Sequence, residues 1–168
     1  MTVQLIHYDA LTPAQRAGLP GIEVLAAQRA FCGDIEGALH TLLNRPGDDV
    51  RGLALLVGGV PQGFLLLKRG AHLPPWARHD AATLHALQVD WRAQGQGLGR
   101  WCLAALPARV REVWPQVRCL QLSVDTDNQA ALRLYRARLF YTLEAADEAA
   151  SVDTRRTRHT QQHTRQHT

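Results

Sequence analysis

The stretch that decides the fold is Leu84-His-Ala-Leu-Gln-Val-Asp-Trp-Arg-Ala-Gln-Gly-Gln-Gly-Leu-Gly-Arg100. Its apolar start predicts a β-strand over residues 83–89, and the apolar spacing after the glycines predicts a helix from Gly97 to about Val113. Glycines at the junction have no Cβ, so a ligand can approach the main chain closely. The first amides of a helix lack internal partners and lie at the positive end of its dipole, which suits a phosphate group. The segment therefore predicts an anion site, although a tight turn without a ligand would use the same glycines.

Further strands and helices are predicted on both sides of this segment. Two apolar runs that flank Gly58-Gly59 predict a β-hairpin. Pro107 is expected to kink or divide the helix after the glycines. The other expected elements are a strand over 3–8, a helix over 12–19 with Thr12 as its cap and Pro13 in its first turn, a helix over 34–44, a strand over 118–124, a helix over 128–138 and a strand over 139–145. The resulting order, β-α-α-β-β-β-α-β-α-β, predicts a mixed α/β sheet.

The composition is that of one globular domain. The chain has 168 residues, of which 46% are hydrophobic and 20% charged, so it is not wholly disordered. It has no apolar run near the ~20 residues of a membrane span and no secretory signal pattern, which predicts a soluble cytoplasmic protein without membrane partners. Cys32, Cys102 and Cys119 have no metal-like spacing and are expected to be free, mostly buried thiols.

The positive charge is concentrated in the last residues. Four of the 19 Lys and Arg residues, and one of the 15 Asp and Glu residues, lie in 151–168, so the rest of the chain carries 15 basic against 14 acidic side chains. A nearly neutral body argues against a nucleic-acid groove. Residues 149–168 are too polar to bury a face, so we expect a disordered tail. Two alternatives stay open: an edge strand, or a helix on which His159, His163 and His167 share one face and bind a metal. We predict no functional metal.

Two interpretations of the glycine segment compete. One is a Rossmann dinucleotide site of an NAD-dependent oxidoreductase, with Asp125 as the ribose ligand. Against it, the spacing is G-x-G-x-G where that fingerprint has G-x-G-x-x-G. The segment also comes in the middle of the chain, after a β-hairpin, and too few elements follow it for a doubly wound sheet.

The other interpretation is a resemblance to the Gcn5-related N-acetyltransferase (GNAT) superfamily. Gln94-Gly-Gln-Gly-Leu-Gly99 is similar to its Q/R-x-x-G-x-G/A acetyl-CoA signature. Asn128-Gln-Ala-Ala-Leu-Arg-Leu-Tyr135 is similar to its later motif N-x-x-A-x-x-L-Y, although Leu139 stands where the family usually has a glycine. The segment Leu106–Pro115 also resembles the bacterial diamine and polyamine acetyltransferase branch.

The resemblance implies a fold and a domain. The expected fold is α/β (α+β), with a mixed, mostly antiparallel sheet of six to seven strands flanked by about four helices. Residues 1–148 would form the acetyltransferase domain and 149–168 the polar tail. The family's seventh strand is not visible, which leaves one sheet edge to be altered or to be completed by a partner chain in a homodimer.

The resemblance also implies an activity, the transfer of an acetyl group from acetyl-CoA to a primary amine of a small molecule, by direct attack in a ternary complex. A non-catalytic CoA-binding regulatory protein stays open as an alternative. The residues expected to bind the cofactor are Leu87, Val89, Gln94, Gly95, Gln96, Gly97, Leu98, Gly99, Arg100 and Asn128, where Asn128 could equally cap a helix.

The implied catalytic groups are a phenol and an imidazole. Tyr135 would protonate the leaving CoA thiolate as a general acid, since a phenol is neutral at pH 7. His85 is the candidate general base, and strand alternation would place it on one face with Leu87 and Val89. Acidic residues near the first two helices, where the family usually has its amine pocket, would suit a cationic substrate such as a polyamine; they are Glu23, Asp34 and Glu36.

Overall fold

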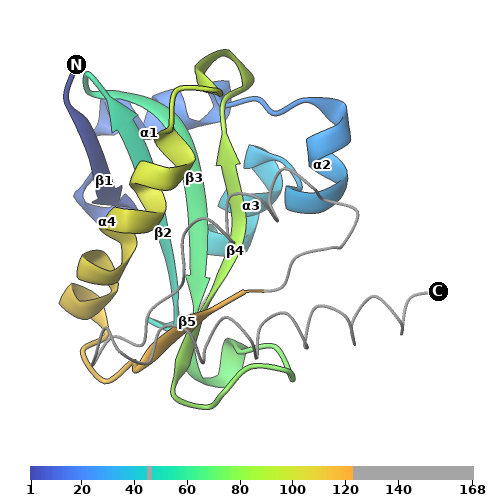
Figure 1. The fold of residues 1–168 in the computed structure, drawn as a ribbon, viewed down its shortest axis with the longest axis vertical. Coiled ribbons are helices and arrows are strands. Elements are labelled where there is room, and N and C mark those ends of the chain that lie inside the picture. The colour runs from blue at the N-terminus through green and yellow to red at the C-terminus, as the bar shows by residue number, and fades with distance from the viewer. Residues whose placement is uncertain (45–46, 123–168) are drawn as a thin grey trace.

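A five-stranded sheet carries the fold in the computed structural model, which describes residues 1–44 and 47–122 (Figure 1). The strands follow one another across the sheet in chain order as β1 (Val3–His7), β2 (Val50–Val57), β3 (Val60–Lys68), β4 (Ala81–Val89) and β5 (Cys119–Gln121). The first three pairings are antiparallel and the β4–β5 pairing is parallel. The predicted α/β class with a mostly antiparallel sheet is therefore confirmed, and this sheet is not the doubly wound parallel sheet of a Rossmann domain.

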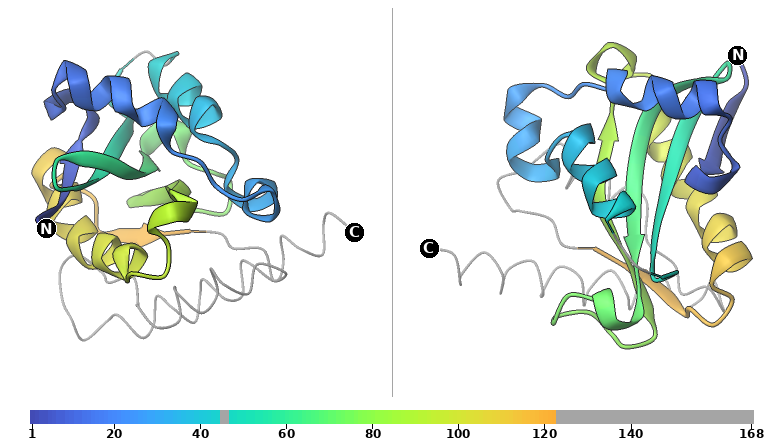
Figure 2. Two further views of the ribbon diagram at one scale, coloured as in Figure 1. Left: turned by 90° about the horizontal axis from the view of Figure 1, so that it is seen from above. Right: turned by 180° about the vertical axis from the view of Figure 1, so that it is seen from behind.

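Helices cover both faces of the sheet (Figure 2). They are α1 (Pro13–Gly18), α2 (Ala26–Cys32) and α3 (Ile35–Leu43) on one face and α4 (Leu98–Val113) on the other. Two apolar cores result, because alternate residues of a strand point to opposite faces. Leu65 and Leu67 of β3 enter the core with Leu106 of α4, whereas Phe64 of β3 enters the core with Ile35 of α3.

Local sequence signals explain several elements. The Thr12 hydroxyl accepts from the Gln15 amide at 3.1 Å, and the Gln15 side chain accepts from the Thr12 amide at 2.9 Å, which forms a capping box at the start of α1. Gly58 and Gly59 have φ of 58° and 79°, as the two-residue turn between β2 and β3 requires. The predicted hairpin and the first predicted helix are therefore confirmed.

The structure differs from the sequence analysis at two helices. Helix α2 was not predicted, because none of its residues is buried and its sequence shows no apolar stripe. Helix α4 runs unbroken through Pro107, so this proline does not divide it. The helix keeps its course because buried residues on both sides of Pro107, among them Leu103 and Val110, hold it against the sheet.

None of the described helices is long and apolar enough to cross a bilayer. Short 3₁₀ turns join the main elements. The turns are η1 (Tyr8–Ala10), η2 (Leu19–Gly21), η3 (Gly70–His72) and η4 (Trp91–Ala93).

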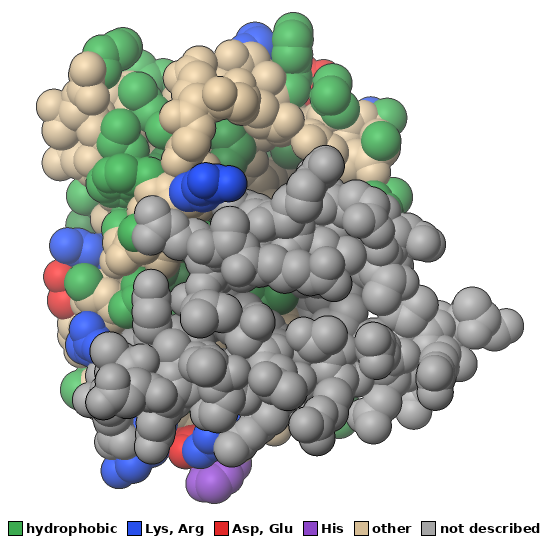
Figure 3. All heavy atoms as spheres, in the orientation of Figure 1, with side chains coloured by type: hydrophobic (Ala, Val, Ile, Leu, Met, Phe, Trp, Pro, Cys, Tyr) green, Lys and Arg blue, Asp and Glu red, His purple; other side chains and the backbone are tan. Residues whose placement is uncertain are grey.

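Where described side chains are visible in Figure 3, Lys and Arg lie among apolar and uncharged ones. The cysteines agree with the prediction of free thiols, since Cys102 and Cys119 are buried and Cys32 is half-buried.

Candidate functional site

Strand β4 has a bulge in its middle. Its pairing with β3 shifts by one residue, so that Ala86 and Leu87 together face Leu65. Ala86 has a φ of 54°, a left-handed conformation that costs a residue other than glycine roughly 1–2 kcal/mol. The surrounding sheet therefore holds β4 in a shape that it would not adopt alone.

The bulge separates residues that regular alternation would keep together. His85 lies opposite Leu66 and faces α2 and α3, whereas Leu87 and Val89 pack against the core under α4. The prediction that His85, Leu87 and Val89 share one face is wrong, because one extra residue reverses the alternation. The candidate base and the candidate cofactor contacts thus lie on opposite faces of β4.

The second half of β4 has an open edge in the described structure. Strand β5 pairs with β4 only over Ala81–Thr83. The Asp90 amide donates to the Gln62 carbonyl of β3 at 2.7 Å. Because successive residues of a strand direct their amides to opposite sides, the Val89 amide points to the open edge. The Val89 carbonyl points there too and accepts a hydrogen bond from Gln94 Nε2 at 2.8 Å.

A glycine loop (residues 94–97) leads from this edge into α4. Gly95 and Gly97 both have a φ of 78°, and a Cβ built on either would meet nothing within 4 Å. Gly97 is the N-cap of α4 and has no side chain with which to cap this helix end. The structure thus has exposed main chain at a helix N-terminus, which is the geometry that an anion site needs. Beside it, Gln96 and Arg100 are exposed, Gly99 is half-buried and Leu98 is anchored in the core.

The side chain of Gln94 is bonded within the protein. Its side chain exchanges two hydrogen bonds of 3.0 Å with Gln28 of α2, besides the bond to Val89. Its own amide donates to the Trp91 carbonyl at 3.4 Å. These bonds occupy Gln94, so we interpret it as the anchor of the glycine loop, and Gln28 is a site residue that the sequence analysis missed.

An ion pair between the buried Asp90 and the exposed Arg92, here called the Asp90 clamp, holds the same loop to the N-terminal half of the chain. The Asp90 carboxylate is 2% exposed and accepts from the Glu23 amide at 2.9 Å and from Arg92 Nε and Nη2, each at 2.9 Å. Arg92 also reaches the Gly21 carbonyl at 3.1 Å, and the Trp91 amide bonds the Glu23 carbonyl at 2.8 Å. The Arg92 guanidinium holds the pKa of Asp90 below its usual value. The sequence analysis missed this clamp, and the signal that could have found it is an aspartate that directly follows an apolar strand.

The α2–α3 pocket lies on the other face of β4 and has a volume of about 440 Å³. It is lined by Arg29, Cys32, Gly33, Asp34, Gly37, Ala38, Thr41, Leu66, Lys68, His85 and Ala86. Of the three acidic residues predicted for an amine pocket, Asp34 alone lines it. Glu36 is exposed on α3, and Glu23 contributes its main chain to the Asp90 clamp.

His85 is the imidazole of this pocket. Its Nε2 lies 2.6 Å from the Thr83 hydroxyl. Burial, assisted by the charge of Lys68, lowers the pKa of His85 from 6.5 to about 4. His85 is therefore neutral at pH 7, but it takes up a proton only weakly.

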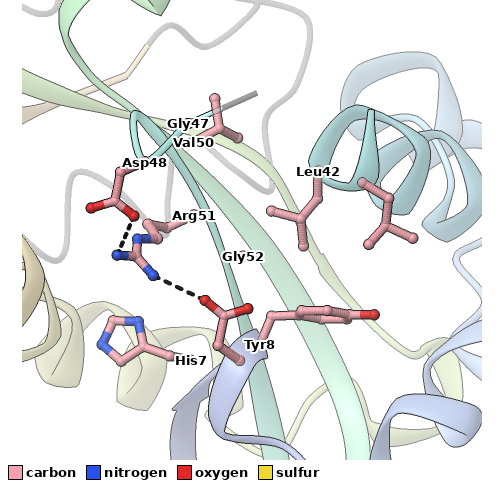
Figure 4. Close-up of a pocket in the computed structure, with 10 residues that line it drawn as sticks. His7, Tyr8, Leu42, Gly47, Asp48, Val50, Arg51 and Gly52 are labelled. Carbon is pink, nitrogen blue, oxygen red and sulfur yellow. Dashed lines mark hydrogen bonds and ion pairs between the residues drawn. The ribbon is translucent and has the colours of Figure 1, made fainter. Parts of the chain in front are cut away.

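A second cavity of about 190 Å³ lies where β1 ends and β2 begins, and it shares no lining residue with the first (Figure 4). Arg51 crosses it and forms ion pairs with Asp48 and, at 3.0 Å, with Asp9. One guanidinium thus stands against two carboxylates, so this part of the cavity carries a net negative charge.

Two predicted site residues, Asn128 and Tyr135, lie outside the described residues, as do the predicted helix 128–138 and the polar tail. Residues 1–44 and 47–122 contain no group of three or more His, Cys, Asp or Glu side chains placed to hold a metal ion.

The comparisons with known proteins identify the class. The sequence profile of the acetyltransferase (GNAT) family matches residues 23–140. The chain belongs to this family, whose members are acetyl-CoA-dependent N-acetyltransferases, so the resemblance seen in the two motifs is confirmed. No curated protein matches the sequence significantly.

Solved structures agree with this assignment. The GNAT domain of PAT from S. lividans matches with a TM-score of 0.59 at 20% identity, over 80% of this chain and 78% of that one. The ribosomal-protein-S18-alanine N-acetyltransferase of Escherichia coli matches with a TM-score of 0.55 at 25% identity, over 81% and 76%. An aminoglycoside acetyltransferase, AAC(6')-Ib, in complex with an aminoglycoside and acetyl-CoA, matches with a TM-score of 0.59 at 19% identity, over 81% of each chain. Two of these neighbours are named for different acceptors, a ribosomal-protein alanine and an aminoglycoside, so the shared fold leaves the acceptor open.

Proposed function

We propose that this protein transfers an acetyl group from acetyl-CoA to a primary amine of a small molecule, in the class of polyamines and amino acids, that enters from the α2–α3 pocket. The observation that carries the proposal is the glycine loop, where left-handed Gly95 and Gly97 expose main chain beside the open edge of β4. The amides of the loop and of the first turn of α4 bind the diphosphate of the cofactor. The pantetheine arm pairs with the main chain of Leu87 and Val89 along the open edge.

The Val89 amide is the proposed electrostatic catalyst. It donates to the thioester carbonyl oxygen as negative charge develops there, a contribution of about 3–4 kcal/mol for a well-placed donor. The amine attacks the carbonyl carbon in its neutral form, the new C–N bond forms, the C–S bond breaks, and the nitrogen releases one proton to water, which balances the proton that Tyr135 gives up and regains from solvent. Tyr135 gives its proton to the leaving CoA sulfur, and Asn128 bonds the cofactor arm; both roles rest on the motif they belong to.

Direct attack needs no acyl-cysteine, and the described cysteines favour this route. Cys32, the thiol of the α2–α3 pocket, lies 3.2 Å from the Gln28 carbonyl and 3.4 Å from the Gly33 carbonyl. Burial raises the pKa of this thiol, so it is protonated at pH 7. Burial in the core raises the pKa of Cys102 to about 12. A stable acetyl-enzyme formed from acetyl-CoA alone would contradict the proposal.

A matched pair of glycine variants tests the cofactor site. Gly97 and Gly59 have φ of 78° and 79°, and a Cβ on either would meet nothing within 4 Å. Gly97→Ala and Gly59→Ala should therefore lose similar stability, about 1–2 kcal/mol each, through backbone strain alone. Only Gly97→Ala should weaken CoA binding, measured by the rise in melting temperature that CoA causes. Equal CoA affinity of the two variants would contradict the proposed cofactor site.

The activity itself is tested by CoA thiol release with a panel of amino acids, aminoglycosides, polyamines and peptide N-termini. Tyr135→Phe should slow release strongly while CoA affinity is kept. CoA binding without release for any amine would favour the non-catalytic alternative.

A further inference from the structure

The charges in the α2–α3 pocket bear on which amine the protein accepts, and the inference drawn from them rests on the proposed function. Among the lining residues, Arg29 and Lys68 are cationic, Asp34 is the one acid, and His85 is neutral at pH 7. The described lining thus has an excess of positive charge. An acceptor that is itself a polycation would meet repulsion from both cations.

The one acid among the described lining residues, Asp34, also holds its own helix. Asp34 is the N-cap of α3, and its Oδ1 accepts a hydrogen bond from the Gly37 amide at 2.8 Å. This bond satisfies one of the orphan amides of the helix, so the carboxylate serves the fold as much as the pocket. The two other acids that suggested a cationic substrate, Glu23 and Glu36, do not line the pocket. The described lining therefore holds a single carboxylate, which is too few to bind both ammonium groups of a diamine.

Arg29 is in the opposite situation. It lies on α2 at the wall of the pocket, and within residues 1–44 and 47–122 its guanidinium has neither a hydrogen bond nor an ion pair. A guanidinium presents paired donors that match a carboxylate. The charge of Lys68 acts across the same space, since it contributes to the lowered pKa of His85. Arg29 therefore favours an anionic group in the pocket.

We propose that the acceptor is a primary amine that also carries a carboxylate, such as an amino acid, and that Arg29 binds this carboxylate. Asp34 and the neutral His85 then lie beside the amine end of the acceptor. A polyamine or another polycation is disfavoured. This assignment differs from the substrate expected from the acidic residues of the sequence, because the fold turns two of the three away from the pocket.

Two sets of matched amines test the proposal by CoA thiol release. One set is glycine, glycinamide and 1,2-diaminoethane; the other is 4-aminobutanoate, 4-aminobutanamide and 1,4-diaminobutane. Within a set, the group opposite the amine is anionic, neutral or cationic at nearly constant length. The carboxylate member of at least one set should have the highest kcat/KM, by about 10-fold or more over the amide, as for a charge-assisted hydrogen bond.

The variants tie this preference to one side chain. Arg29→Gln should lower kcat/KM for the carboxylate amine by about 10- to 100-fold, mainly through KM, and leave the amide unchanged. Arg29→Glu should shift the preference toward the diamine. Arg109→Gln, which removes an exposed arginine paired with Glu112 on α4, is the control and should change neither value.

The outcomes separate this inference from the function it rests on. Faster transfer to diamines than to carboxylate amines, with Arg29→Gln unchanged, would overturn the inference and leave the acetyltransferase intact. No thiol release with any amine of the wider panel would overturn both.

Discussion

Asp90→Asn is the substitution that best tests how the site is held together. The side chain keeps its size, but the carboxylate becomes an amide with one acceptor oxygen and one NH2 group. In the wild type all the partners of Asp90 are donors: the amides of Glu23 and Arg92 and the guanidinium of Arg92. An asparagine must turn its NH2 toward one of these donors. The change therefore replaces attraction with an unsatisfied contact in a buried position.

The magnitude follows from the bond to Glu23. Its donor is an amide 67 residues away in sequence, at 2.9 Å from a carboxylate that is 2% exposed. A hydrogen bond to a charged group contributes about 1.5–3 kcal/mol, and we give little weight to Arg92 because its side chain is 58% exposed. Asp90→Asn should thus lower the free energy of unfolding by about 2–3 kcal/mol. Since the clamp also positions the glycine loop, CoA affinity should fall as well.

The assay is urea unfolding of the wild type, Asp90→Asn and a control, Asp9→Asn. Asp9 also pairs with an arginine, Arg51, at 3.0 Å, but its side chain is 75% exposed, so its loss should cost under about 1 kcal/mol. The pKa of Asp90 is lowered in the folded state, so its stabilising effect is full above the unfolded value near 3.8 and is lost as the pH falls through the folded value. The difference in free energy of unfolding between the wild type and Asp90→Asn should therefore become smaller below about pH 4. Equal urea midpoints for Asp90→Asn and Asp9→Asn at pH 7 would refute the reasoning.

Three further substitutions have defined outcomes. The pKa of His85 is about 4 in the folded state and 6.5 in the unfolded state, so the unfolded state takes up the proton first as the pH falls. Through this group the free energy of unfolding of the wild type should fall by about 2–3 kcal/mol between pH 7 and pH 4.5. Urea titrations at the two pH values should show that His85→Gln lacks this loss. Gly63→Ala would place a Cβ 2.9 Å from the Gln88 carbonyl, so it should destabilise by about 1–3 kcal/mol, and an unchanged melting temperature would argue against the observed register. Pro107→Ala restores a helical N–H in α4 and should raise the melting temperature, which calorimetry would show; a fall would mean that the proline ring packs better than the alanine.

The sequence predicted those parts of the fold that depend on neighbouring residues. A turn of two glycines between apolar runs, a threonine cap followed by proline, and glycines at a strand-to-helix junction each act within a few residues of chain. The structure has all three, and the family profile confirms the class that the motifs indicated.

The contacts that hold the site depend on tertiary structure instead. Gln28 and Gln94 are 66 residues apart, and Asp90 and the Glu23 amide are 67 apart. Neither pair has a local pattern, because each partner is an ordinary polar residue in its own segment. Helix α2, which carries Gln28, buries no residue, so its sequence has no apolar stripe from which a helix could be predicted. The sequence placed Gln94 in the right loop but could not show that its side chain was already bonded.

The bulge in β4 marks the limit of reasoning from alternation. The partner strand β3 carries one sequence signal of the bulge, Gly63, which faces Val89. A side chain at position 63 would collide with the Gln88 carbonyl and with Leu55. The backbones of β3 and β4 therefore approach closely only because residue 63 is glycine. That signal becomes legible only once the register of β3 against β4 is known, and periodicity within β4 alone gives the opposite face for His85. The same inserted residue directs His85 to the α2–α3 pocket while Val89 keeps its packing under α4. One residue of register thus separates the acceptor side of the proposed site from its cofactor side.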